Sequence, residues 1–206
     1  MFLLSLLCFT LEESNGILNR SSLYTMVFLA QSIAYFRNHA ELKTERVQFP
    51  VQIIAAGYML AGISKLRETG LMWVAEAPQA SLQIVKGYCA AYFNFGDISQ
   101  LQKGITLAAF ALHHALFVKI LFGVSLFLEL FAWVAVKNKT RTLVYGLLLT
   151  GMHMGIYYFM HILIVAIFFP MLLFMVNPVY LLYFSFTQVL QQVIRFFTKA
   201  KETVSN

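Results

Sequence analysis

Charged residues are scarce in this sequence. Of 206 residues, 15 are Lys or Arg and 9 are Asp or Glu, so 12% of the chain is charged while 60% is apolar. The mean hydropathy is +0.72. A soluble domain of this length needs more charge to cover its surface, which excludes that class. We predict an all-α fold, a polytopic membrane helix bundle of about four to six transmembrane helices plus one interfacial helix, because several apolar stretches approach the roughly 20 residues that cross a bilayer.

The sequence also has only two cysteines, Cys8 and Cys89, which lack paired spacing. This excludes a cysteine metal cage and a thioredoxin-like motif, whereas a disulfide between the two stays open. No metal site is predicted. Internal repeats and low-complexity segments are lacking too, so residues 1–206 are predicted to form a single integral membrane domain.

Acidic residues are fewer than basic ones, which gives a net charge of +6 and a pI of about 9.4. Most Lys and Arg residues lie in short segments between or after apolar runs. This pattern indicates positive-inside anchoring in a bilayer rather than nucleic-acid binding. By the same rule, the loops 37–46 and 137–141 are predicted to be cytoplasmic and the segment 65–103 extracytoplasmic.

The opening stretch, "MFLLSLLCFTLEESNG", is apolar but differs from a signal peptide. It lacks a basic first region, and Glu12 and Glu13 stand where a small-residue cleavage site would lie. We expect a short or half-spanning first helix. The next expected helices cover residues 23–36 and 47–64, the latter entered through Pro50.

A long excursion, 65–103, follows and is predicted to hold a helix at the membrane interface within 77–96. There Tyr88, Tyr92 and Phe93 would lie at headgroup depth.

The second half of the chain holds the longest apolar runs. The run 105–136 is too long for one span, so we expect it to begin at the interface around His113 and His114 and to cross from about Leu116. The run 142–169 is predicted to be a single span. Pro170 and Pro178 then break the pattern.

A last amphipathic helix presents three glutamines on one side, Gln188, Gln191 and Gln192. Lipid cannot satisfy these amides. Together with the short first helix, they predict lateral contact with another membrane subunit or with a copy of the chain itself.

Lys65 is the first candidate functional residue. It follows Gly57 and Ala61 at four-residue spacing, so it continues a small-residue face on which another helix can pack. The alternative is a lysine that snorkels from a helix end, and the two interpretations are even.

His153 is the second candidate. With Gly146, Thr150, Tyr157 and His161 it forms a polar stripe on an apolar helix, and ionisable groups at membrane depth normally face the protein interior or a wet cavity. A hydrogen-bonded histidine that orients helices is the simpler alternative.

Glu129 on the preceding helix lies at a similar depth, so a Glu129–His153 pair would satisfy both groups. Haem ligation by two histidines is not indicated by any spacing. We predict that Lys65, Trp73, Glu129, His153 and Tyr157 border one outward-opening cavity for a lipophilic molecule or lipid.

Three stretches, "YMLAGISKLRETGLMW", "LFLELFAWV" and "LLLTGMHMGIYYFMHI", resemble the horizontally transferred transmembrane (HTTM) domain of vitamin K-dependent gamma-carboxylases and their bacterial relatives. The likeness covers roughly residues 47 to 165. It implies Lys65 as the base that starts quinol oxidation, with Glu129 and His153 as further catalytic candidates. A quinone or a lipid would then be bound by Trp73, Tyr157 and His161.

A weaker likeness is to small DoxX/MauE-type membrane proteins. The carboxylases carry a large lumenal domain after this region, whereas this chain ends at Asn206. We therefore expect a non-catalytic subunit or assembly factor of a membrane complex. The alternative is a quinone-coupled membrane enzyme.

Overall fold

The computed structural model describes residues 22–36, 45–162, 165–179, 181–183, 185–187 and 191. Every regular element in these ranges is helical, which confirms the predicted all-α class. The predicted first helix, most of the loop 37–46, Gln188 and Gln192 lie outside the described residues, and Gln191 is exposed. The elements are α2 (Ser22–Phe36), α3 (Glu45–Thr69), α4 (Met72–Ala75), η2 (Ala77–Gln79), α5 (Ala80–Phe95), α6 (Ile98–His113), α7 (Ala115–Leu130), η3 (Ala132–Val136), α8 (Lys139–Met160), α9 (Val165–Met171) and η4 (Leu172–Val176).

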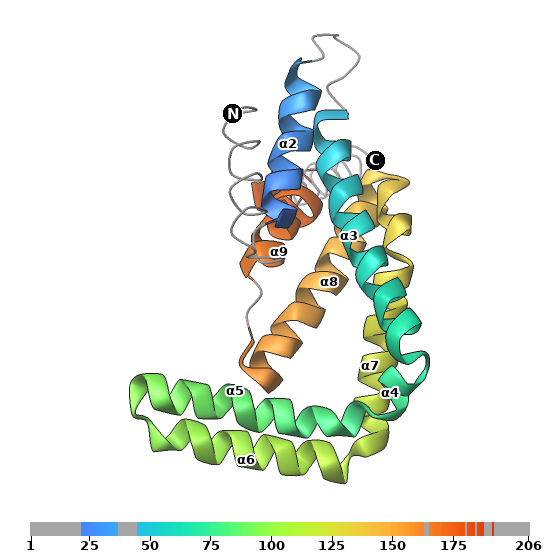
Figure 1. The fold of residues 1–206 in the computed structure, drawn as a ribbon. Helices are drawn as coiled ribbons and strands as arrows, with labels where there is room; N and C mark the ends of the chain where they lie inside the picture. The colour runs from blue at the N-terminus through green and yellow to red at the C-terminus, as the bar shows by residue number, and fades with distance from the viewer. Residues whose placement is uncertain are drawn as a thin grey trace, which may run out of the picture.

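The helices form an upright bundle with a two-helix hairpin lying across one end. Figure 1 shows α3 beside α7 and α2 beside the upper part of α3, whereas α5 and α6 run side by side, crosswise to the others. The bundle core comprises Val27, Val51, Ile54, Ala55, Tyr58, Leu128, Ala132, Ala135, Tyr145, Leu149, Met171 and Met175. A second core joins the hairpin to α7 through Ala77, Ile84, Tyr88, Ala108, Ala111 and Val118.

Three helices of the described chain are long and apolar enough to cross a membrane: Gln48–Thr69, Lys139–Met160 and Ile167–Thr187. The bent pair Ile98–His113 and Ala115–Leu130 makes a fourth if it is counted as one span. Large apolar side chains also cover much of the outer surface, for example Leu60 at 65% exposure. Four is the lower end of the predicted number of spans.

Helices α6 and α7 meet at His113 and His114 with a bend of 92°, close to the point from which the run 105–136 is predicted to cross the membrane. The helix before the bend starts earlier than expected, at Ile98 instead of Ile105. Asp97 caps it by accepting a hydrogen bond of 2.9 Å from the Ser99 backbone N–H. The preceding Gly96 ends α5 with a φ of 71°. These two caps turn the chain into the hairpin.

The predicted single span 142–169 is wrong. Helix α8 ends at Met160, because His161 takes a left-handed conformation with a φ of 55°. Pro170 does not end a helix either, since it lies inside α9, and the turn comes at Asn177, with a φ of 45°. The other long helix, α3, continues to Thr69 instead of ending at residue 64.

Close contacts at two glycines hold α5 against α6 and the hairpin against α8. A Cβ on Gly104 of α6 would lie 2.5 Å from the Cβ of Tyr88, and one on Gly87 of α5 would lie 2.0 Å from the carbonyl oxygen of Met160. Tyr88 is 2% exposed and donates a 2.8 Å hydrogen bond to the backbone oxygen of Tyr158. It is therefore a core residue that joins the hairpin to α8.

Candidate functional site

Lys65 and Glu129 form an ion pair inside the bundle. The Lys65 Nζ lies 2.5 Å from one carboxylate oxygen of Glu129 and 2.6 Å from the other. The side chain of Lys65 is 25% exposed and that of Glu129 7%. The two charges therefore neutralise each other, which offsets part of the free-energy cost of burying them.

A glycine on α3 brings the two residues together. A Cβ on Gly62 would lie 3.2 Å from the Cβ of Glu129, so the missing side chain lets α7 approach α3 at this level. The buried face of α3 runs through Tyr58 and Gly62 to Lys65, whereas Ala61 is exposed. The predicted packing stripe through Gly57 and Ala61 was therefore displaced by about one residue.

Trp73 covers the lysine from the side. Gly70, with a φ of 59°, ends α3, and the short helix α4 then carries Trp73 back toward it. The Lys65 Nζ lies 5.0 Å from the centre of the Trp73 ring, within the range of a cation–π interaction. The ring also packs against Phe122 at 5.9 Å between centroids. Indole and carboxylate thus both contact the lysine ammonium.

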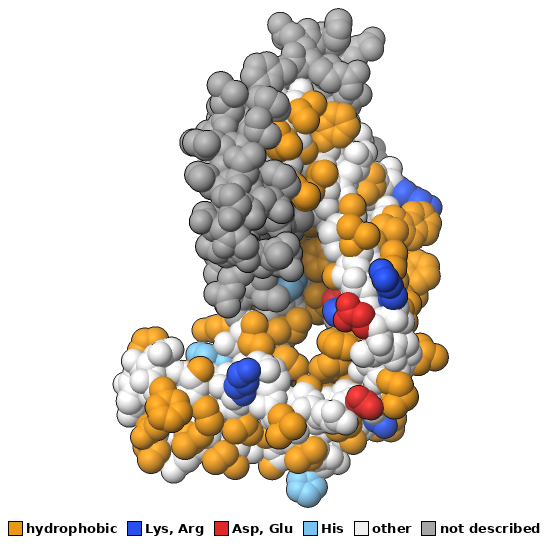
Figure 2. Space-filling model, in the orientation of Figure 1, with side chains coloured by type: hydrophobic (Ala, Val, Ile, Leu, Met, Phe, Trp, Pro, Cys, Tyr) orange, Lys and Arg blue, Asp and Glu red, His pale blue; other side chains and the backbone are white. Residues whose placement is uncertain are grey.

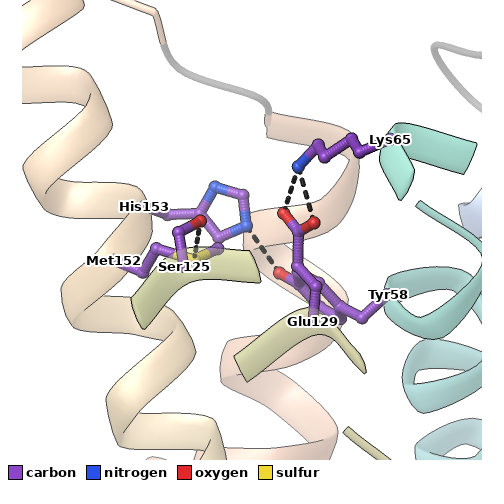
Figure 3. Close-up of polar contacts among 6 residues, drawn as sticks. All are labelled: Tyr58, Lys65, Ser125, Glu129, Met152 and His153. Atoms are coloured by element: carbon purple, nitrogen blue, oxygen red, sulfur yellow. Dashed lines mark hydrogen bonds and ion pairs between the residues drawn. The ribbon is translucent and has the colours of Figure 1, made fainter. Parts of the chain in front are cut away.

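His153 lies close by but has a different partner. Its Nε2 forms a 2.5 Å hydrogen bond with the Tyr58 hydroxyl, which also lies 3.5 Å from the Met171 sulfur. Tyr58 and His153 are each 5% exposed, so the bond satisfies two buried polar groups. The predicted Glu129–His153 pair is wrong, because the Glu129 carboxylate is engaged by Lys65. Figure 3 shows both pairs and the Ser125–Met152 contact in one cluster.

An open cavity of about 830 Å³ lies between the hairpin and the upright helices. Figure 2 shows the hollow between these two parts of the molecule. Its lining is mostly apolar and includes Phe110, Phe117, Phe122, Phe159 and Met152, and its polar members are Lys65, Thr69, Glu76, Gln79, Gln83, Ser125 and Glu129. A concave, mainly apolar space with a few polar groups is the usual form of a small-molecule site.

Of the six predicted site residues, Lys65, Trp73 and Glu129 line this cavity. His153 lies behind the wall, bonded to Tyr58. Tyr157 and His161 stack on each other with centroids 5.5 Å apart, and His161 also packs 5.2 Å from Tyr88, where the hairpin meets α8. The structure does not bring these three to the cavity.

Two glycines of α8 belong to the cavity wall and were not predicted. A Cβ added to Gly151 or to Gly155 would meet nothing within 4 Å, and both residues line the cavity. Glycine inside a helix lowers stability by about 0.5–1 kcal/mol relative to alanine. No close contact in the described chain requires glycine at these two positions, and their effect is to keep the cavity open. Their four-residue spacing was a visible signal. Tyr58, the partner of His153, was not among the predicted site residues either.

Among the described residues, no group of three or more His, Cys, Asp or Glu side chains could hold a metal ion. Comparison with family models, with curated proteins and with solved structures finds no match to this chain. The site is therefore interpreted from its own geometry.

Proposed function

We propose that this chain is an integral membrane protein that binds a lipophilic small molecule, acting as a non-catalytic subunit or accessory protein of a membrane complex. One observation carries the proposal: a cavity of about 830 Å³ with a mostly apolar lining and one ion pair in its wall. This volume lies within the range of about 300–1,000 Å³ typical of sites for ligands of drug size. The ligand would be a lipid or a quinone-like molecule.

Membrane insertion is part of the proposal. The three or four helices of sufficient length and hydropathy in the described chain support it, as do the apolar side chains on their outer faces. The test is labelling of single cysteines at Lys86 on the hairpin and Lys139 at the start of α8, in a background without Cys8 and Cys89. The two sites should react from opposite sides of the membrane, and equal reaction from one side would refute this topology.

The non-catalytic interpretation rests on the state of Lys65. A general base needs a free lone pair near its substrate. The Lys65 ammonium instead donates to both oxygens of Glu129 and lies over Trp73. In this arrangement the lysine acts as a fixed cation, which supports holding a ligand more than abstracting a proton.

A quinone-coupled enzyme is the second candidate. The observation that favours it is the cluster of Figure 3, in which the Lys65–Glu129 and Tyr58–His153 pairs lie together and offer groups that exchange protons. In that case Lys65 would serve as the base after Glu129 has moved away. Purified protein that passes electrons from a quinol to an added electron acceptor, at a rate lost in Lys65→Met, would favour this candidate over binding alone.

The binding proposal is tested by purifying the chain in mild detergent and identifying extracted lipophilic molecules and co-purifying proteins by mass spectrometry. Gly151→Leu fills the cavity and should abolish retention of the extracted molecule. The control Ala109→Leu places the same leucine side chain on the exposed outer side of α6, away from the cavity lining, and should retain the molecule. Equal retention by both variants would refute the site.

A further inference from the structure

The charges around the cavity restrict the ligand that it can accept. Among the residues that the structure describes, three charged side chains line it, the cation of Lys65 and the carboxylates of Glu76 and Glu129. The lining therefore carries one positive and two negative charges. This asymmetry bears on the polar end of any ligand of the proposed site, and the inference rests on the proposed function.

The single cation is already neutralised. The Lys65 Nζ contacts both oxygens of Glu129, at 2.5 and 2.6 Å, and the Trp73 ring lies on another side at 5.0 Å. An anionic group that approached Lys65 would come close to the Glu129 carboxylate as well. Repulsion between the two anions would offset the attraction, and the anion would also lose its hydration in an apolar space.

Uncharged hydrogen-bonding groups remain accessible at the same wall. An ammonium has three hydrogens, and the two contacts to Glu129 use two of them, which leaves one donor. The Ser125 hydroxyl donates to the Met152 sulfur at 3.1 Å, so its oxygen can accept a hydrogen bond. Gln79 and Gln83 add amides that both donate and accept. A hydroxyl or carbonyl group can be satisfied here without a new charge.

We infer that the cavity selects lipids whose polar end is an uncharged hydroxyl or carbonyl group, and rejects the same chain when it ends in a carboxylate. The apolar lining takes the hydrocarbon chain, which passes over the open space at Gly151 and Gly155. Lys65 and Ser125 hold the polar end. Glu129 acts as the selectivity residue, because its carboxylate cancels the cation of Lys65, the one cation that the described residues place in the lining.

The test compares three probes of equal chain length: hexadecanol, hexadecanoate and hexadecylamine. Radiolabelled hexadecanol is bound to immobilised full-length protein in detergent micelles at pH 9, where hexadecanoate is ionised, and the other two compete with it. Hexadecanol should bind at least tenfold more tightly than hexadecanoate. Hexadecanoate that binds as tightly as hexadecanol would overturn the inference.

A single substitution should reverse the preference for the two oxygen-bearing probes. Glu129→Gln leaves Lys65 as an uncompensated cation, so the affinity for hexadecanoate relative to hexadecanol should rise at least tenfold. Ser125→Lys, which adds a cation to the same wall, gives a second route to this change should the first variant not fold. The matched control Glu68→Gln makes the same charge change on α3 outside the cavity lining, and its ratio should equal that of the parent chain.

The outcomes distinguish a failure of the charge selection from a failure of the proposed function. A ratio unchanged by both Glu129→Gln and Ser125→Lys would overturn the charge selection while leaving a lipid site in place. Absence of binding by all three probes would instead overturn the proposed function, and the inference with it.

Discussion

Replacing Lys65 and replacing Glu129 should destabilise the protein by different amounts, although each change removes the same ion pair. The difference follows from what is left behind. Lys65→Met leaves the Glu129 carboxylate, whose side chain is only 7% exposed. Glu129→Gln leaves the Lys65 ammonium on a flexible stem that is 25% exposed and already lies over Trp73.

The magnitudes can be worked from these environments. A buried charge that loses its partner costs about 3–5 kcal/mol, and this range applies to Lys65→Met because the carboxylate cannot reach water by extending. In Glu129→Gln the new amide oxygen still accepts from Lys65, and the lysine head can turn toward water, so the cost is about 1 kcal/mol. The double variant Lys65→Met/Glu129→Leu removes both charges and should regain most of the stability lost in Lys65→Met.

The assay is reversible unfolding of the purified chain in mixed micelles with increasing SDS, followed by circular dichroism. Glu68→Gln serves as the control for charge removal on an exposed part of α3 and should change stability little. The reasoning is refuted if Glu129→Gln costs as much as Lys65→Met, or if the double variant is as unstable as the sum of its single changes.

Three further predictions concern packing and caps, and all use the same unfolding assay. Tyr58→Phe removes the partner of His153 and should cost about 1–3 kcal/mol, whereas a change below about 0.5 kcal/mol would show that the hydrogen bond contributes little. Gly87→Ala places a methyl group against a backbone oxygen of α8 and should destabilise the protein by at least about 1–3 kcal/mol. Gly151→Ala meets only open space and should be neutral or stabilise by up to about 1 kcal/mol. The reverse order of stabilities would contradict the observed contact between the hairpin and α8. Hydrogen bonds from the side chain and, to a smaller extent, the backbone N–H of Ser99 lower the pKa of Asp97. The ionised Asp97 therefore contributes to stability above the unfolded pKa of about 3.9, and this contribution is lost as the pH falls through the lower pKa of the folded protein. Asp97→Asn should keep the helix cap and remove this pH dependence, and an unchanged pH profile would show that the cap carboxylate is not its source.

Much of the helical content was predictable because hydropathy reports where an apolar segment runs. The run 105–136 exceeds the length of one span, which drew attention to His113 and His114, where α6 and α7 meet. Hydropathy could not reveal the end of α8, since apolar residues continue past His161, which takes a left-handed backbone conformation and packs against Tyr88 of the hairpin. The hairpin turn had a local signal in Gly96 and Asp97, a helix-ending glycine followed by a capping residue, which was overlooked.

The residues of the site were partly predictable for a similar reason. Helical spacing indicates which face of one helix is polar, and this was enough to draw attention to Lys65, Glu129 and His153. The partner of each residue depends on how neighbouring helices rotate and how closely they approach. Gly62 decides that Glu129 meets Lys65, and Tyr58 takes the place expected for Glu129 beside His153. The spacing within one helix carries no information on either event.

The contact of Gly87 with the end of α8 has a thermodynamic consequence. The wall of the cavity is shared between the hairpin, which contributes Gln83 and Ile84, and α8, which contributes Gly151 and Gly155. A molecule that contacts both parts binds more tightly when the hairpin is seated on α8 than when the hairpin has separated from it. By linkage, such a molecule must strengthen the seating by the same factor by which seating strengthens its own binding. A bound molecule therefore raises the fraction of protein in which the hairpin is seated across the end of the bundle.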